Sequence, residues 1–200
     1  MAAQTRGWRE GGRLLILLMA ALLVMSAIIV ASMGGAMDGT RMLIRATARS
    51  SLLLFLAAFC AGTLVRLRPA PTARWAIRNR RWLGLAFAFS HLLHLLAIVW
   101  LYGAHGNQAP PPPTATLVGG GAAYLFIVLL AATSTDGAVR MLGARNWQRL
   151  HTAGVWYIWL IFMISYGGRA VTNPLYIPPA LLLIAAAALR LVPARKGVRA

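Results

Sequence analysis

Apolar residues gather in six long runs, which are separated by shorter stretches rich in arginine, glycine and proline. The runs cover residues 14–33, 51–65, 82–103, 117–134, 147–166 and 175–192. A helix needs about 20 residues to cross about 30 Å of hydrocarbon. The second run is long enough only if residues 42–49 continue the same helix, with their arginines reaching toward the lipid headgroups. The pattern predicts an all-α, polytopic membrane protein with six transmembrane helices.

The composition supports this prediction. Hydrophobic residues make up 60% of the 200 positions, and the acids are only Glu10, Asp38 and Asp136. A water-soluble protein would need far more polar surface. The first run is longer than the 7 to 15 apolar residues of a signal peptide, so we expect an uncleaved first span. We therefore expect an N-terminal segment at 1–13, one six-helix domain at 14–192 and a basic tail at 193–200.

The twenty arginines and lysines are distributed unevenly between alternate connections. One side of a six-span layout receives sixteen: Arg6, Arg9, Arg13, Arg66, Arg68, Arg74, Arg78, Arg80, Arg81, Arg140, Arg145, Arg149, Arg190, Arg195, Lys196 and Arg199. The other side receives four: Arg41, Arg45, Arg49 and Arg169. The positive-inside rule then predicts that both termini are cytoplasmic, and we expect a multi-pass protein of a bacterial inner membrane.

The net charge of +17 raises the question of a nucleic-acid partner. The basic residues flank the apolar runs and form no surface in which basic and aromatic side chains interleave. Topology and contact with anionic membrane lipid explain this charge better. We expect no nucleic-acid binding.

Histidines inside two of the runs are the main candidates for chemistry. His91 and His94 lie in the third run, and His151 lies near the start of the fifth. An imidazole in hydrocarbon needs a partner, and a metal ion or porphyrin iron is one that keeps it there. Because His91 and His94 are three residues apart, they share one helix face. A flat cofactor between the third and fifth helices would take one histidine from each; the alternative is that each histidine hydrogen-bonds a nearby carbonyl. His105 follows its run in a polar loop, and we expect it at the interface.

Haem b fits these histidines better than zinc does. No Asp, Glu or Cys is placed to complete a tetrahedral zinc site, whereas haem iron accepts two imidazoles and its ring prefers an apolar slot. Arg41, Arg45 and Arg49 are spaced four apart at the external end of the second helix and share a face. They are candidate partners for haem propionates, although simple snorkelling would explain the same spacing. Cys60 is alone, which excludes both a disulfide framework and a CxxC pair.

Two stretches resemble a known family. They are RRWLGLAFAFSHLLH at residues 80–94 and TSTDGAVRMLGARNWQRLH at residues 133–151. Together with the six-span layout, residues 42–192 resemble the ferric reductase-like transmembrane family, and most of all the haem-binding membrane subunits of bacterial methionine sulfoxide reductase systems. The resemblance implies one haem b per chain, with His94 and His151 as axial ligands of the iron, and electron transfer across the bilayer.

The chain departs from that family at two places. Those subunits carry another histidine about 13 residues after the first one on the fifth helix, where this chain has Ile164 and Ser165. His91 is an additional histidine, one turn closer to the cytoplasmic side than the family position. The resemblance favours His94 as the axial ligand, whereas the expected depth of His151 favours His91.

The predicted function is that of an electron relay. The chain has no GxGxxG, P-loop or CxxCH motif, so we expect no nicotinamide or flavin domain of its own. Electrons would come from quinol or from a separate cytoplasmic flavin reductase, and would pass to an external acceptor protein or to ferric iron. The chain would then be the electron-transfer membrane subunit of an oxidoreductase. The alternatives are a haem-less scaffold or assembly subunit and a small-solute transporter, although the scarcity of acids in the spans argues against cation transport.

Overall fold

We describe the chain from a computed structural model, which covers residues 10–106 and 108–193. All of the regular structure in this part of the chain is helical. The helices are α1 (Gly11–Met33), α2 (Met37–Leu67), α3 (Pro71–His105), α4 (Thr114–Ala132), α5 (Asp136–Leu142), α6 (Ala144–Ala170), the 3-10 turn η1 (Pro174–Tyr176) and α7 (Ile177–Leu191). The predicted all-α fold is confirmed.

Six of the helical segments are long and apolar enough to cross a membrane: α1, α2, α3, α4, α6 and η1 with α7. Each of them exposes large apolar side chains, among them Ile16, Leu53, Val99, Val128, Ile164 and Leu181. Water would not solvate such surfaces well, whereas lipid tails would. The six predicted spans are confirmed, and the chain is a multi-pass membrane protein by length and composition. Most of the predicted N-terminal segment, at 1–9, and of the basic tail, at 194–200, lies outside the described residues.

The second span is a single long helix, as the prediction required. α2 runs through residues 42–49 without interruption and reaches Leu67. The runs at 51–65 and 82–103 leave residues 66–81 as a long basic loop, and this expectation is wrong in extent, because only residues 68–70 separate α2 from α3. Pro71 stands at the first position of α3, where its missing N–H costs nothing. The arginines and alanines that follow favour helix, so the basic stretch adds more than two turns to the third span.

The region after the fourth span also differs from the prediction. α4 ends at Ala132 instead of 134, and the polar residues that follow it lead into the short helix α5. The Thr135 hydroxyl accepts a hydrogen bond from the amide of Ala138 at 3.1 Å and caps α5. Gly143 then separates α5 from α6 with φ of +75°, a backbone conformation that favours glycine. α6 consequently begins at Ala144, three residues before the predicted start.

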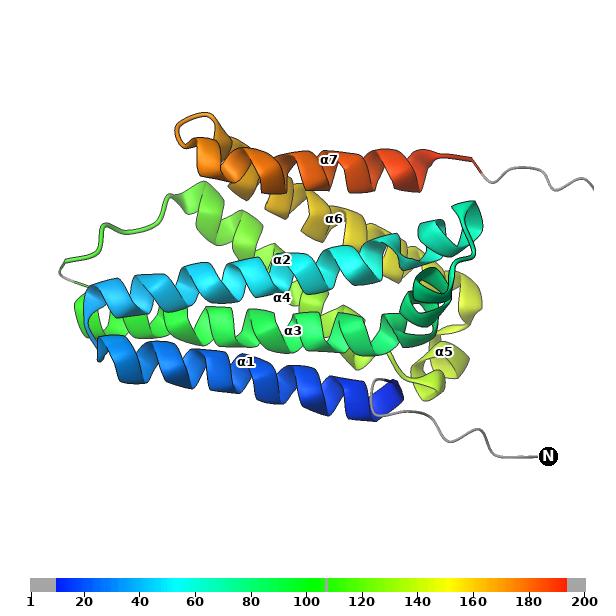
Figure 1. Ribbon diagram of the computed structural model, residues 1–200, viewed down its shortest axis with the longest axis horizontal. Helices are drawn as coiled ribbons and strands as arrows, with labels where there is room; N and C mark the ends of the chain where they lie inside the picture. The colour runs from blue at the N-terminus through cyan, green and yellow to red at the C-terminus, as the bar shows by residue number, and fades with distance from the viewer. Residues whose placement is uncertain (1–9, 107, 194–200) are drawn as a thin grey trace, which may run out of the picture. The chain divides into compact units, whose positions relative to one another are not determined.

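The described chain divides into two compact units. Unit 1 comprises Met1–Phe55 and Arg81–Gly121, and unit 2 comprises Leu56–Arg80 and Ala122–Ala200. In unit 1, α1 and the adjoining parts of α2 and α3 run side by side (Figure 1). The Ser50 hydroxyl of α2 lies 3.6 Å from the Met25 sulfur of α1, and α2 meets α3 through the polar contacts of the candidate site.

Polar and aromatic contacts join the helices of unit 2. The Arg190 guanidinium of α7 donates to the carbonyl of Phe59 in α2 at 2.7 Å, and it lies 4.3 Å from the centre of the Phe59 ring. The indole N–H of Trp159 in α6 donates to the carbonyl of Leu183 in α7 at 2.9 Å. Each of these contacts gives a polar side chain a hydrogen-bond partner within the protein, which hydrocarbon could not supply.

Candidate functional site

One ring nitrogen of His94 lies within hydrogen-bond distance of two oxygen atoms of α2. Its Nδ1 lies 3.1 Å from the carbonyl oxygen of Ile44 and 3.1 Å from the hydroxyl oxygen of Thr47. A carbonyl oxygen only accepts hydrogen bonds, so Nδ1 carries the proton and donates it. In the neutral imidazole the lone pair then belongs to Nε2, the nitrogen that does not face this carbonyl.

Three polar residues next to His94 form further contacts between α2 and α3. The side chains of Thr47, Ser51 and Ser90 are fully buried, each with 0% exposure. The Ser51 hydroxyl donates to the Ser90 hydroxyl at 3.0 Å, and the Ser90 hydroxyl donates to the carbonyl of Thr47 at 3.3 Å. In each helix the polar positions are four residues apart, at 47 and 51 and at 90 and 94, so each pair occupies one helix face.

His91 belongs to a row of rings in unit 1. The ring centres of Phe55 and Phe87 are 5.5 Å apart, those of Phe87 and His91 5.3 Å, and those of His91 and His94 5.3 Å. The Nδ1 atom of His91 is buried and makes no hydrogen bond to a described residue, although its ring has these neighbours. The two histidines therefore share one apolar, aromatic environment, but only His94 has its Nδ1 held by a carbonyl.

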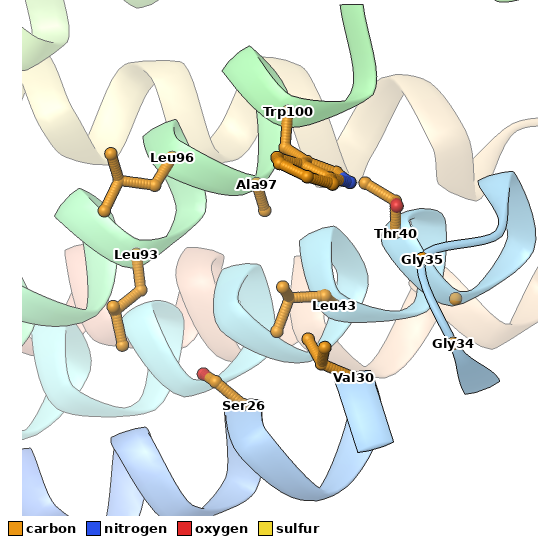
Figure 2. A pocket seen from close by; sticks show the side chains of 11 residues that line it. Ser26, Val30, Gly34, Gly35, Thr40, Leu43, Leu93, Leu96, Ala97 and Trp100 are labelled. Carbon is orange, nitrogen blue, oxygen red and sulfur yellow. The ribbon is translucent and has the colours of Figure 1, made fainter. Parts of the chain in front are cut away.

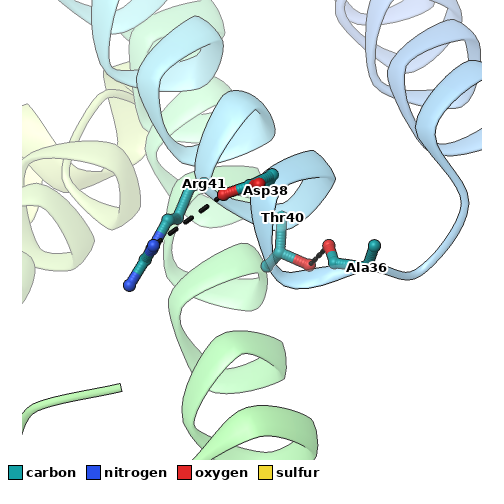
Figure 3. A network of polar contacts seen from close by, with 4 residues as sticks. All are labelled: Ala36, Asp38, Thr40 and Arg41. Atoms are coloured by element: carbon teal, nitrogen blue, oxygen red, sulfur yellow. Dashed lines mark hydrogen bonds and ion pairs between the residues drawn. The ribbon is translucent and has the colours of Figure 1, made fainter. Parts of the chain in front are cut away.

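Arg45 and Arg49 lie on α2 and are exposed. Each is two residues away from Thr47, which corresponds to a rotation of about 200° around the helix. They therefore point away from the face through which α2 contacts His94. At the start of the same helix Arg41 forms an ion pair with Asp38 at 3.8 Å (Figure 3).

His151 lies on α6 in unit 2, two turns after the helix begins. Its ring stacks on the indole of Trp147, with centres 4.1 Å apart and planes 27° apart. Its Nε2 lies 3.0 Å from the hydroxyl oxygen of Thr133. That hydroxyl donates its own proton to the carbonyl of Leu129, so it accepts from Nε2. The lone pair of His151 consequently lies on Nδ1, opposite to the arrangement in His94.

The predicted site residues thus fall in both units. His91, His94, Arg45 and Arg49 belong to unit 1, and His151 belongs to unit 2. The expectation that His105 lies in a loop is wrong, because it is the last residue of α3; its Nε2 lies 2.9 Å from the carbonyl oxygen of Gly35.

Two hydroxyl groups that contact the histidines, Thr47 at His94 and Thr133 at His151, were not predicted from the sequence. The sequence does contain a pattern that indicates Thr47: Thr47 and Ser51 are polar residues four positions apart in an apolar stretch, so they share one helix face. No such pattern marks Thr133, because it lies at the end of α4 and meets His151 only through the fold.

A cavity of about 310 Å³ lies elsewhere in unit 1. Its wall includes Ser26, Val30, Leu43, Leu93, Leu96 and Trp100, contributed by α1, α2 and α3 (Figure 2). No histidine lines it. Positions 93, 96 and 100 occupy a different face of α3 from the histidines, so the cavity and the His91–His94 pair are separate features.

Among the described residues, no three His, Cys, Asp or Glu side chains come close enough to hold a metal ion by themselves. A haem differs from such an ion because the porphyrin supplies four of the iron ligands and the protein supplies at most two. No family model matches the chain, and neither a curated protein nor a solved structure matches it. The resemblance of the two histidine motifs to the ferric reductase-like family stays a prediction.

Proposed function

We propose that this chain is a b-type haem protein of a bacterial inner membrane that relays single electrons across the bilayer. His94 and His151 are the proposed axial ligands. The observation that carries the proposal is the hydrogen bond from His94 Nδ1 to the Ile44 carbonyl. It gives His94, within an apolar span, the tautomer that binds iron through Nε2.

The hydrogen bond from His94 Nδ1 to the Ile44 carbonyl is of the kind that metal-binding histidines make. A ligating imidazole usually donates its other N–H to a carbonyl or carboxylate, which fixes the ring orientation and increases the electron density at the ligating nitrogen. His94 has such an acceptor, and the rings of Phe87 and His91 give its surroundings the apolar character that a porphyrin prefers. These features favour His94 over His91 as the ligand.

His151 can also serve as an iron ligand, but through a different ring nitrogen or after a change in its hydrogen bond. Its Nε2 donates to Thr133, so iron would bind at Nδ1, or at Nε2 after the Thr133 hydrogen bond has been exchanged. The stacked indole of Trp147 restricts the tilt of the ring in either case. We assign His151 as the second ligand because it is the histidine of α6, where the resemblance to the ferric reductase-like family implies the second ligand.

When bound, haem supplies the one-electron chemistry. The residues of the chain would hold and insulate it: His94 and His151 would orient it, and the apolar spans would exclude water. The role of Arg45 and Arg49 as partners of its propionates stays a prediction, and their position on the other face of α2 from Thr47 does not support it. In the proposed orientation both termini are cytoplasmic. The donor would be quinol or a cytoplasmic flavin reductase, and the acceptor an external protein or ferric iron, as in the ferric reductase-like family.

Haem binding by single variants tests the ligand assignment. The full chain is purified from haem-replete cells, and haem per chain is measured for the wild type and for His94→Ala, His151→Ala and His105→Ala. We expect the first two variants to lose haem or its low-spin spectrum. His105→Ala is the matched control, because His105 lies on α3 but bonds the Gly35 carbonyl. Equal haem content in the wild type and His94→Ala would contradict the assignment.

One observation favours a second candidate function, a haem-less scaffold or assembly subunit. The Thr133 hydroxyl and the Trp147 ring already give His151 contacts of the kind that a purely structural histidine makes. A scaffold would be colourless in its wild-type form, and His151→Ala would lower its stability without any spectral change. The same set of proteins therefore distinguishes the two functions.

A further inference from the structure

We propose that Thr47 is a positioning residue for His94: its hydroxyl oxygen accepts a hydrogen bond from Nδ1–H and holds the imidazole in the tautomer that would bind iron. This inference rests on the proposed haem function. It assigns a role to a residue that lies on a different helix from either proposed ligand.

The hydrogen bonds within α2 make the Thr47 oxygen an acceptor. The Thr47 hydroxyl lies 2.8 Å from the carbonyl of Leu43 and 3.1 Å from that of Ile44. Its single proton is used by these carbonyls, so the oxygen is left with lone pairs for a donor. The His94 Nδ1–H at 3.1 Å is that donor.

Two acceptors therefore converge on one N–H. The Ile44 carbonyl and the Thr47 hydroxyl, both from α2, lie at the same distance of 3.1 Å from His94 Nδ1. A 180° flip of the ring would place Cδ2 where Nδ1 lies and would break both contacts. Thr47 is fully buried, and its own carbonyl accepts from Ser90 of α3 at 3.3 Å, which fixes the register of the two helices beside His94.

Loss of the Thr47 hydroxyl should shift the midpoint potential of a bound haem in one direction. Donation from Nδ1–H makes the imidazole a stronger electron donor toward iron and so favours the ferric state. Loss of the Thr47 acceptor weakens this donation. Removing the group that accepts a hydrogen bond from a metal-binding histidine commonly lowers metal affinity by about 10-fold to 100-fold. We expect Thr47→Val to move the haem midpoint potential to more positive values and to weaken haem binding about 10-fold.

The same helix supplies a matched control. The Thr40 hydroxyl also donates back to the carbonyl four residues earlier, that of Ala36, at 3.2 Å (Figure 3), and Thr40 is also buried. No hydrogen bond joins it to a histidine. Thr40→Val therefore removes the same group from the same helix without touching His94, and Thr47→Ser restores the hydroxyl at position 47.

The experiment compares purified wild type, Thr47→Val, Thr47→Ser and Thr40→Val by redox titration, low-spin spectrum and haem affinity. A positive shift and weaker binding for Thr47→Val alone, with Thr47→Ser close to wild type, would support the positioning role. Wild-type potential and spectrum in haem-loaded Thr47→Val would overturn it, even if the variant were less stable. Equal shifts in Thr47→Val and Thr40→Val would also overturn it. A wild type without haem would instead refute the proposed function itself, and the role of Thr47 with it.

Discussion

Replacing Trp147 tests how firmly unit 2 holds His151. The indole makes two separable contacts: its N–H donates to the carbonyl of Thr133 at 2.8 Å, and its face stacks on the His151 ring at 4.1 Å. Trp147→Phe removes the hydrogen bond and keeps an aromatic face. Trp147→Leu removes both contacts.

The expected magnitudes follow from these two contacts. Hydrogen bonds between membrane helices contribute about 0.6 kcal/mol on average and up to about 1.7 kcal/mol. Stacked aromatic pairs add about 0.5–1.5 kcal/mol beyond the area they bury. We expect Trp147→Phe to lower the free energy of unfolding by about 1 kcal/mol and Trp147→Leu by about 2 kcal/mol.

The assay is reversible unfolding of the full chain in detergent by added sodium dodecyl sulfate, followed by far-ultraviolet circular dichroism. Trp100→Phe is the control, because Trp100 is 58% exposed and its replacement should change the free energy by less than about 0.5 kcal/mol. Wild-type stability in both Trp147 variants would refute the claim that this indole anchors α6 to the end of α4. Equal losses in Trp147→Phe and Trp147→Leu would refute the stacking contribution.

Substitutions at three further positions, Gly154, Arg190 and Asp38, test other contacts. A Cβ at Gly154 would lie 3.0 Å from the Leu130 side chain, so Gly154→Val should destabilise unit 2 by about 1–3 kcal/mol in the same assay. Gly168→Val in the same helix meets nothing within 4 Å and should cost less; equal costs would contradict the close approach. Arg190→Met should lose about 2 kcal/mol, since a charged hydrogen bond and a ring contact disappear, and Arg190→Lys should recover only part of it. Asp38→Asn should change stability by less than about 0.5 kcal/mol, because its ion pair is exposed; a larger loss would show that the pair stabilises the start of α2.

The spans could be predicted from the sequence because each one needs only length and apolar character. Their ends could not be predicted as well, because helix boundaries depend on local capping. At Pro71 a basic stretch that was expected to form a loop continues as helix, since arginine and alanine are good helix formers. At Thr135 a hydroxyl caps a short helix that hydropathy alone does not reveal.

The candidate site was predictable in its residue types and only partly in its surroundings. The spacing of His91 and His94 correctly places their rings side by side. Which nitrogen of His94 carries the proton depends on Ile44 and Thr47, residues that are distant in sequence and meet the ring only when α2 packs on α3. The tautomer of His151 depends in the same way on Thr133. Contacts between helices, which no local pattern specifies, therefore decide the chemistry of these histidines.

The most direct test of the central claim is a reduced-minus-oxidised absorption spectrum of the purified wild-type chain, with haem quantified per chain. The proposed function predicts a sharp b-type α-band and about one haem per chain. A colourless protein purified from haem-replete cells would contradict it and would favour the scaffold.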